Sequence, residues 1–298
     1  TLFRSRHPRR RVLPQEGEER GPLPHSGGLS RRTALPRAVL PTGEDMARVV
    51  VVGIGELGSV FARGLLRCGH TVVPVTRGMS MSEVAAREPE PDLALVAVGE
   101  TDLDSVLADL PARWRSRVGL VQNELRFLTW RSHGIENPSV AVVWFEKKPT
   151  TLIKELLPTL IYGPHADLLT EALRAVGVTT RVCRDESELT RELASKNLYI
   201  ATTNIAGLVQ GGTVSALWRD HRELALGVAR DVLAIERALC DESLDEAVML
   251  AAFESAIAAD PEHACAGRSA PARLARALAH AERLALPVPA LRRVAESR

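Results

Sequence analysis

The sequence has few cysteines, few lysines and no long apolar run. The shortage of cysteines and the lack of a long apolar run each exclude a class of protein. Its four cysteines stand far apart and form no CxxC pair, which argues against a disulfide framework and a cysteine zinc site. No stretch reaches the roughly 18 uninterrupted apolar residues of a membrane span. The apolar core of a signal peptide is also missing. We therefore expect a soluble, cytoplasmic protein with free thiols, no bound metal and no membrane partner.

Charge is balanced, with 38 Lys and Arg against 37 Asp and Glu. A net charge of +1 gives no general reason to expect a nucleic-acid partner. The basic residues include only four lysines, which are Lys147, Lys148, Lys154 and Lys196. A guanidinium cannot release a proton near neutral pH, whereas an amine can. A lysine that persists in such an arginine-rich chain is therefore a candidate for proton transfer.

Residues 1–45 differ from the rest of the chain. They contain three consecutive arginines, several prolines and an acidic cluster, without a helical or strand period. Such a segment buries too little apolar surface to offset its ordering entropy, so we expect disorder. Because Met46 stands immediately before the first clear strand, we expect translation to begin there and the leader to be non-native. The alternative is a basic arm for nucleic acid.

From residue 46 the hydrophobic pattern predicts an α/β fold, with a Rossmann-type parallel sheet domain followed by an all-helical domain. The predicted strands are 48–52, 71–76, 92–98, 118–122, 140–145 and 179–183, with helices at 58–68, 102–110 and 166–176. Four helices rich in alanine and leucine follow, at 189–209, 216–239, 244–259 and 272–286. We place the domain boundary between 46–184 and 185–298, with a cleft between the domains.

A glycine motif, G-x-G-x-x-G, separates the first strand from the first helix. It comprises Gly53, Ile54, Gly55, Glu56, Leu57 and Gly58, and a second strand follows within about 30 residues. The spacing predicts a tight turn, close approach of a pyrophosphate to the backbone, and a helix N-terminus that favours negative charge. The alternative is a glycine-rich turn in another α/β fold. The Glu56 carboxylate is unfavourable beside a phosphate unless it points to solvent.

The end of the second strand indicates which dinucleotide binds. It carries Thr76 and Arg77, and no acid follows until Glu83, whereas an NAD site usually has a carboxylate there for the ribose hydroxyls. Arg77 can pair with a 2′-phosphate, so the sequence favours NADP. The alternative is that Arg77 is one more surface arginine.

From Met46 almost to its end the chain resembles the ketopantoate reductase family. The resemblance includes the phosphate loop, the segment VQN and the helix RELASKNLYIATTNIAGL. It implies a Rossmann domain joined to a helical domain of the 6-phosphogluconate dehydrogenase type. Glu192, Leu193 and Lys196 match the family's E-L-x-x-K segment, which implies that Lys196 is catalytic. Asn204 matches the second family asparagine, whereas Ile200 replaces the first.

Lys196 also stands out on physical grounds, since it lies in an otherwise apolar helix. At 100° per residue Thr203 falls about 20° and Asn204 about 80° from it around the helix, so all three can share one face. A partly buried amine has a lowered pKa and can donate a proton to a carbonyl oxygen. We therefore predict substrate contacts for Asn204, Thr203 and Asn123, and a further cofactor contact for Asn123. The alternatives are a solvated lysine and ordinary cap or turn residues.

The chain departs from the family pattern at three places. Gly99 stands where the family has a lysine after the third strand, and Asn123-Glu124 replaces an asparagine-glycine turn. Pro271 occupies the position of a substrate-contacting glutamate. We therefore expect the cofactor site to be kept and the substrate to differ from ketopantoate. The candidates for a replacement acid are Glu254, Asp260, Glu262 and His263.

These observations predict an NADPH-dependent reductase of a 2-oxo acid or related small carbonyl compound. The main alternative is a non-catalytic NADP(H)-binding redox sensor or regulator. A DNA-binding regulator is disfavoured because the sequence after residue 45 shows no basic stripe. The alanine-rich helices are compatible with a homodimer.

Overall fold

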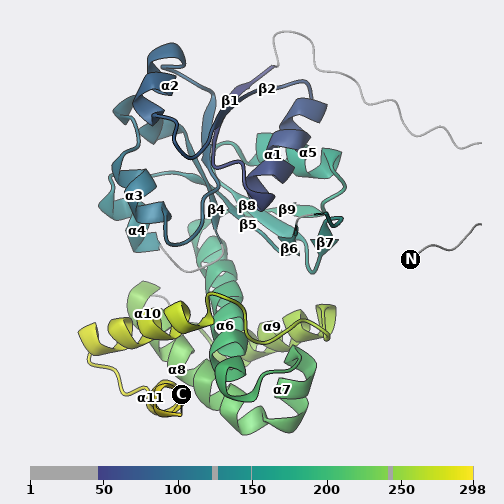
Figure 1. Cartoon of the computed structure of the whole chain (residues 1–298), viewed down its shortest axis with the longest axis vertical. Coiled ribbons are helices and arrows are strands. Elements are labelled where there is room, and N and C mark those ends of the chain that lie inside the picture. Colours follow the sequence, from purple (N-terminus) through teal and green to yellow (C-terminus); the bar gives the residue numbers. More distant parts are fainter. Residues whose placement is uncertain (1–45, 123–126, 149, 241–243, 298) are drawn as a thin grey trace, which may run out of the picture. The chain divides into compact units, whose positions relative to one another are not determined.

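The computed structural model describes residues 46–122, 127–148, 150–240 and 244–297. Within them, seven strands form one sheet (Figure 1). In spatial order they are β2 (Thr71–Val75), β1 (Arg48–Val52), β3 (Leu93–Val96), β4 (Val118–Gln122), β5 (Ser139–Val142), β8 (Thr159–Tyr162) and β9 (Thr180–Val182). Neighbouring strands are parallel, except that β5 and β8 are antiparallel. Pro74 lies in β2, an edge strand, where a missing backbone N–H is tolerated.

Both faces of the sheet are covered by helices. The helices of this part are α1 (Glu56–Arg67), α2 (Met81–Arg87), α3 (Leu103–Ala108), the short 3-10 helix η1 (Ala112–Arg117), α4 (Phe127–Ser132) and α5 (Ala166–Ala175). Because side chains alternate along a strand, Val49 and Val51 pack under α1 and α5, whereas Val50 and Val52 pack on the side of α2 and α3. Figure 1 shows these two groups of helices on opposite sides of the sheet. The strands therefore read as continuous apolar runs.

After β9 the described residues form helices joined by short loops. The helices are α6 (Glu186–Gln210), α7 (Val214–Asp220), α8 (Arg222–Cys240), α9 (Glu246–Ala259), α10 (Ala270–Arg283) and α11 (Pro289–Glu296). The Asp185 side chain caps α6 by accepting a hydrogen bond from the backbone N–H of Glu188, 2.7 Å away. Leu189 and Leu193 of α6 pack in a core of the sheet, whereas Ile205 packs in the helical core. The sheet and these helices therefore share one long helix and belong to one compact unit.

The predicted fold class is confirmed, but the elements differ from the predicted ones in several places, and the helices α2 and α4 and the 3-10 helix η1 were missed. The sheet is not wholly parallel: β8, which the sequence analysis missed, returns antiparallel to β5 because a short hairpin of β6 (Phe145–Glu146) and β7 (Lys154–Glu155) replaces a crossover helix. The predicted helix 216–239 is two helices, since His221 leaves the helical conformation without a glycine or proline to mark the break. α11 was also missed.

Two predictions fall outside the described residues, namely the disordered leader 1–45 and the position of Asn123. The boundary predicted between 184 and 185 falls two residues before α6 and stays a prediction. Among the described helices, none is both long enough and apolar enough to cross a bilayer.

Candidate functional site

The phosphate loop has the backbone that the glycine spacing predicts. Gly53 has a φ of +92°, and a Cβ there would lie 2.7 Å from the Ala97 carbonyl oxygen. A Cβ on Gly58 would lie 1.9 Å from the Gly53 carbonyl oxygen. Neither position can accept a larger residue without moving the backbone. Both glycines are thus required by the close packing of β1, α1 and the end of β3.

Gly55 differs from its neighbours, because a Cβ there would meet nothing within 4 Å. It is the N-cap residue of α1, and no side chain caps this helix end. The first-turn N–H groups and the positive end of the helix dipole are thus available to an anion. The Glu56 side chain is 45% exposed and lies 3.7 Å from the Lys147 ammonium, which offsets its charge. The loop therefore fits a dinucleotide pyrophosphate.

Arg77 follows β2, as expected for a residue that recognises the adenosine ribose. Its side chain is 95% exposed, and its Nη2 lies 3.2 Å from Asp102 Oδ2. An exposed ion pair of this kind contributes little to stability, so another anion can replace Asp102 beside Arg77. Arg77 is thus exposed just after β2, with Asp102 beside it.

Lys196 lies in the middle of α6 and is only 5% exposed. Burial lowers the pKa of its ammonium from the ordinary lysine value to about 7, because a charge is costly away from water. The charges of Glu192 and Glu100 raise this pKa, whereas that of Arg273 lowers it. The amine lies 5.1 Å from the centre of the Trp144 ring, a cation–π distance. At neutral pH it can therefore both hold and release a proton.

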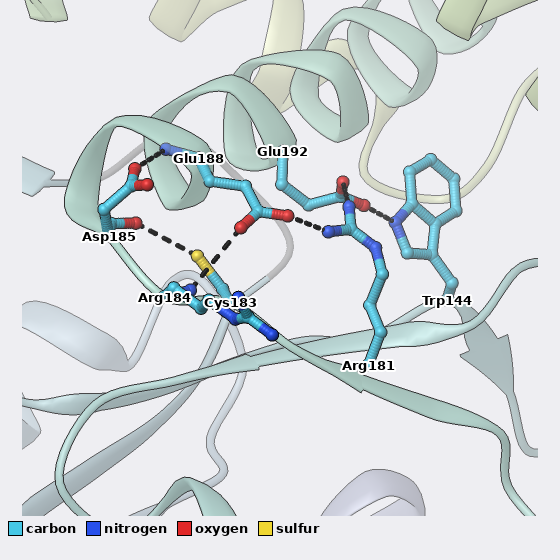
Figure 2. Close-up of polar contacts among 7 residues, drawn as sticks. All are labelled: Trp144, Arg181, Cys183, Arg184, Asp185, Glu188 and Glu192. Atoms are coloured by element: carbon cyan, nitrogen blue, oxygen red, sulfur yellow. Dashed lines mark hydrogen bonds and ion pairs between the residues drawn. The ribbon is translucent and has the colours of Figure 1, made fainter.

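A polar network at the start of α6 fixes the Trp144 ring (Figure 2). Glu192 Oε1 accepts a hydrogen bond of 2.5 Å from the Trp144 indole N–H, and its Oε2 lies 2.6 Å from Arg181 Nη2. Arg181 also pairs with Glu188, one turn earlier on α6. Glu192 thus connects β9, α6 and the ring beside Lys196. This gives a physical role to the glutamate of the E-L-x-x-K segment.

Asn204 lies two turns after Lys196 and faces α10. Its Oδ1 accepts a hydrogen bond of 2.7 Å from Arg273 Nη1. Arg273 Nη2 in turn lies 2.6 Å from Glu100 Oε1, and Arg276 Nη2 lies 2.9 Å from Glu100 Oε2. Glu100 belongs to the loop after β3, so this network joins the carboxyl edge of the sheet to α6 and α10.

The remaining predicted residues are less well placed. Thr203 is 1% exposed, and its hydroxyl donates a hydrogen bond of 2.7 Å to the Tyr199 carbonyl one turn earlier, so that proton is used within the helix. Of the acids near Lys196, the two whose charges raise its pKa are Glu192 and Glu100, and neither is among the four candidates for a replacement acid.

Two of those four candidates belong to a separate cluster. Glu146, Asp260 and His263 each place one ligand-type atom within 4.8 Å of the others. The Lys154 ammonium lies 2.6 Å from Asp260 Oδ2 and already supplies a positive charge there. The expectation of no metal stays a prediction.

The sequence analysis missed four residues of the site, which are Glu100, Trp144, Arg273 and Arg276. For Trp144 there was a signal, a large aromatic residue inside the predicted strand 140–145. Glu100 stands beside Gly99, the position already noted as a departure from the family. Nothing in the sequence distinguishes Arg273 and Arg276 from the many other arginines.

Comparison with known proteins gives structural matches alone. No protein-family model matches the chain, and no curated protein sequence matches it. A PanE/ApbA family ketopantoate reductase from Ralstonia eutropha JMP134 is 19% identical, with a TM-score of 0.62 over 84% of this chain and 97% of that one. The dimeric ketopantoate reductase from Staphylococcus aureus is 14% identical, with a TM-score of 0.58 over 83% and 97%. A D-mandelate dehydrogenase, in a ternary structure with NADH and anilino(oxo)acetate, is 12% identical, with a TM-score of 0.59 over 84% and 96%.

The chain has the fold of the ketopantoate reductases. The matches cover nearly the whole of each related chain, so both the sheet and the helical part take part in the likeness. At these identities the likeness is one of fold.

Proposed function

We propose that this protein is an NADPH-dependent reductase of a 2-oxo acid or a related small carbonyl compound. The observation that carries the proposal is the buried Lys196 ammonium, whose pKa is lowered to about 7 and which lies against Trp144 in the fold of the ketopantoate reductases. The structural neighbours include a ketopantoate reductase and a D-mandelate dehydrogenase with bound NADH, which agrees with this reaction class.

The phosphate loop provides the cofactor site in this proposal. Gly53 and Gly58 shape the turn, and the open position at Gly55 leaves room for a pyrophosphate beside the uncapped start of α1. When bound, a nicotinamide dinucleotide supplies a hydride for reduction of a carbonyl carbon.

Lys196 acts as the general acid. Its ammonium donates a hydrogen bond to the carbonyl oxygen of the substrate and transfers the proton as that oxygen gains negative charge. The product is a 2-hydroxy acid, and the neutral amine takes a new proton from solvent. The Trp144 ring limits where the ammonium can lie, and Glu192 holds that ring. Asn204 orients the substrate together with Arg273.

NADPH is preferred over NADH because of Arg77. An arginine with one exposed acidic partner can pair with the 2′-phosphate, and the end of β2 offers no carboxylate for an unphosphorylated ribose. Replacing Arg77 by Gln should weaken NADPH binding by roughly tenfold and leave NADH binding unchanged. Fluorescence titration with both dinucleotides measures this, and an equal loss for both would contradict the preference.

The decisive experiment measures NADPH oxidation with a panel of 2-oxo acids. We expect turnover with at least one of them, and its loss in Lys196→Ala while NADPH affinity is kept. Tight NADPH binding without turnover on any carbonyl compound would instead support a redox sensor. No affinity for either nicotinamide dinucleotide would refute both functions.

A homodimer through the helical part is a further proposal. Val209 of α6 and Val248 of α9 are 41% and 60% exposed, and one structural neighbour is described as dimeric. Light scattering on the purified chain measures its mass in solution, and a monomer at all concentrations would contradict the dimer.

A further inference from the structure

The ion pairs of Glu100 have the geometry of a bound carboxylate. Each of its two oxygens faces a different guanidinium, with Oε1 2.6 Å from Arg273 Nη2 and Oε2 2.9 Å from Arg276 Nη2. The side chains are only 20%, 15% and 32% exposed, in the order Glu100, Arg273, Arg276. Charge-assisted bonds sheltered in this way are stronger than those of an exposed pair. The two arginines therefore form a cradle for one carboxylate group.

The start of α10 makes this cradle more attractive to an anion. Arg273 is the fourth residue of α10, and Arg276 follows one turn later on the same side. The helix has no acidic residue in its first turn and no side-chain cap. Positive charge at a helix N-terminus is unfavourable, because it adds to the positive end of the helix dipole. A carboxylate bound there relieves this repulsion.

The cradle also belongs to the neighbourhood of Lys196. Arg273 donates to Asn204 on the helix that carries the lysine, and the charges of both Glu100 and Arg273 act on the Lys196 ammonium. Glu100 itself comes from the loop after β3, at the carboxyl edge of the sheet where open α/β folds bind ligands. A group held by Arg273 thus shares with Lys196 the electrostatic surroundings in which the charges of Glu100 and Arg273 act on the ammonium.

We propose that Arg273 and Arg276 bind a carboxylate group of the substrate, and that Glu100 occupies this subsite when substrate is absent. The substrate carboxylate exchanges with Glu100, and no covalent bond changes in this step. This subsite rests on the proposed function only in that the bound carboxylate belongs to a substrate. Binding of a carboxylate itself can be measured without turnover. The ligand class is a small carboxylic acid, with its acid group either beside the carbonyl or further along the chain.

The test titrates the protein calorimetrically with oxamate, whose carboxylate adjoins a carbonyl, and with glutarate, whose carboxylates lie further apart. We expect Glu100→Gln to bind at least one probe more tightly by about fivefold, because an internal competitor is removed. Arg273→Gln and Arg276→Gln should each weaken it by at least about tenfold. The probe that responds identifies the position of the carboxylate.

Controls separate this effect from a general loss of charge. Arg230 Nε lies 2.9 Å from Glu246 Oε1 on α8 and α9, so Arg230→Gln and Glu246→Gln remove the same charges from a more exposed pair elsewhere. Neither should change the affinity for the probes. Should Arg273→Gln fail to fold, Arg273→Lys keeps the charge but loses the planar fork, and we expect it to weaken binding as well.

Kinetics then distinguish the two proposals. Pyruvate and 2-oxoglutarate test the two carboxylate positions, and methyl pyruvate presents a carbonyl without a free acid. NADPH oxidation as fast with methyl pyruvate as with pyruvate, together with unchanged probe affinity in Glu100→Gln, would overturn the subsite but leave the reductase. Arginine-dependent probe binding without any NADPH oxidation would support the subsite and overturn the reductase.

Discussion

The phosphate loop takes its three glycines from residues 53–58, and the atoms that crowd Gly53 and Gly58 belong to the loop itself or to the two residues just after β3. The lysine site takes Glu100, Trp144, Lys196 and Arg273 from four separated segments. In the proposed function the loop holds a dinucleotide through its backbone and an uncapped helix end, whereas the lysine site acts through burial and charge. Under that proposal, a local backbone motif keeps cofactor binding while side chains elsewhere change the substrate. Each prediction below changes one region and asks whether the other responds.

The largest effect is expected at Lys196. Lys196→Met removes the proton donor, so kcat should fall by about 10³-fold while the Kd for NADPH is unchanged. Lys196→Arg keeps the charge but cannot release a proton near neutral pH, so it should be similarly inactive. Stopped-flow kinetics and fluorescence titration measure the two quantities. Substantial activity in Lys196→Arg would show that the ammonium serves only as a charge.

The next effect concerns the phosphate loop. Gly58→Val places a side chain where even a Cβ meets the Gly53 carbonyl at 1.9 Å, so NADPH affinity should fall by about 100-fold and Tm should also fall.

Gly55→Ala provides the contrast within the same loop, since its Cβ meets no protein atom within 4 Å. It should keep the wild-type Tm but lose roughly tenfold in NADPH affinity, because the methyl group occupies space needed by the pyrophosphate. Titration and thermal melting distinguish the two variants. Wild-type affinity in Gly55→Ala would mean that the cofactor lies elsewhere.

The pH profile gives a smaller effect. The general acid must be protonated, so kcat should fall as the pH rises through about 7, the value to which burial lowers the pKa of Lys196. Glu192 raises this pKa, so Glu192→Gln should move the fall to lower pH by about half a unit to one unit. Glu188→Gln is the matched control, because Glu188 also pairs with Arg181. Equal shifts in the two variants would assign the effect to Arg181 instead.

The smallest expected effect is a change in the free energy of unfolding, at a buried carboxyl that bonds to the residue after Lys196. Glu236 is 1% exposed and accepts a hydrogen bond of 2.8 Å from Asn197, and burial raises the pKa of its carboxyl well above the ordinary value. The folded state keeps this proton while the unfolded chain releases it, so wild-type stability should fall as the pH rises above about 4.5. Glu236→Gln should remove this loss and raise Tm by roughly 2–4 °C at pH 8. Urea unfolding at pH 5 and pH 8 checks it, and an equal gain at both pH values would contradict the assignment.

The fold class and the phosphate loop could be predicted from the sequence because both depend on local patterns. Apolar runs alternating with helical periods indicate a covered sheet, and a glycine spacing indicates a backbone shape. The antiparallel return of β8 escaped prediction because a short apolar strand looks the same in either direction. The break at His221 escaped it because no residue there disfavours a helix by itself.

Sequence by itself determined the α/β order and the glycine loop at 53–58, since each follows from neighbouring residues, and it made Lys196 a candidate through its rarity in this chain and the family resemblance. Tertiary structure alone decided what surrounds that lysine. Burial and the charges of Glu100, Glu192 and Arg273 set its pKa, and they act across distances in space that the sequence does not record. For the same reason, only the folded chain shows that Arg273 and Arg276 meet the carboxylate of Glu100.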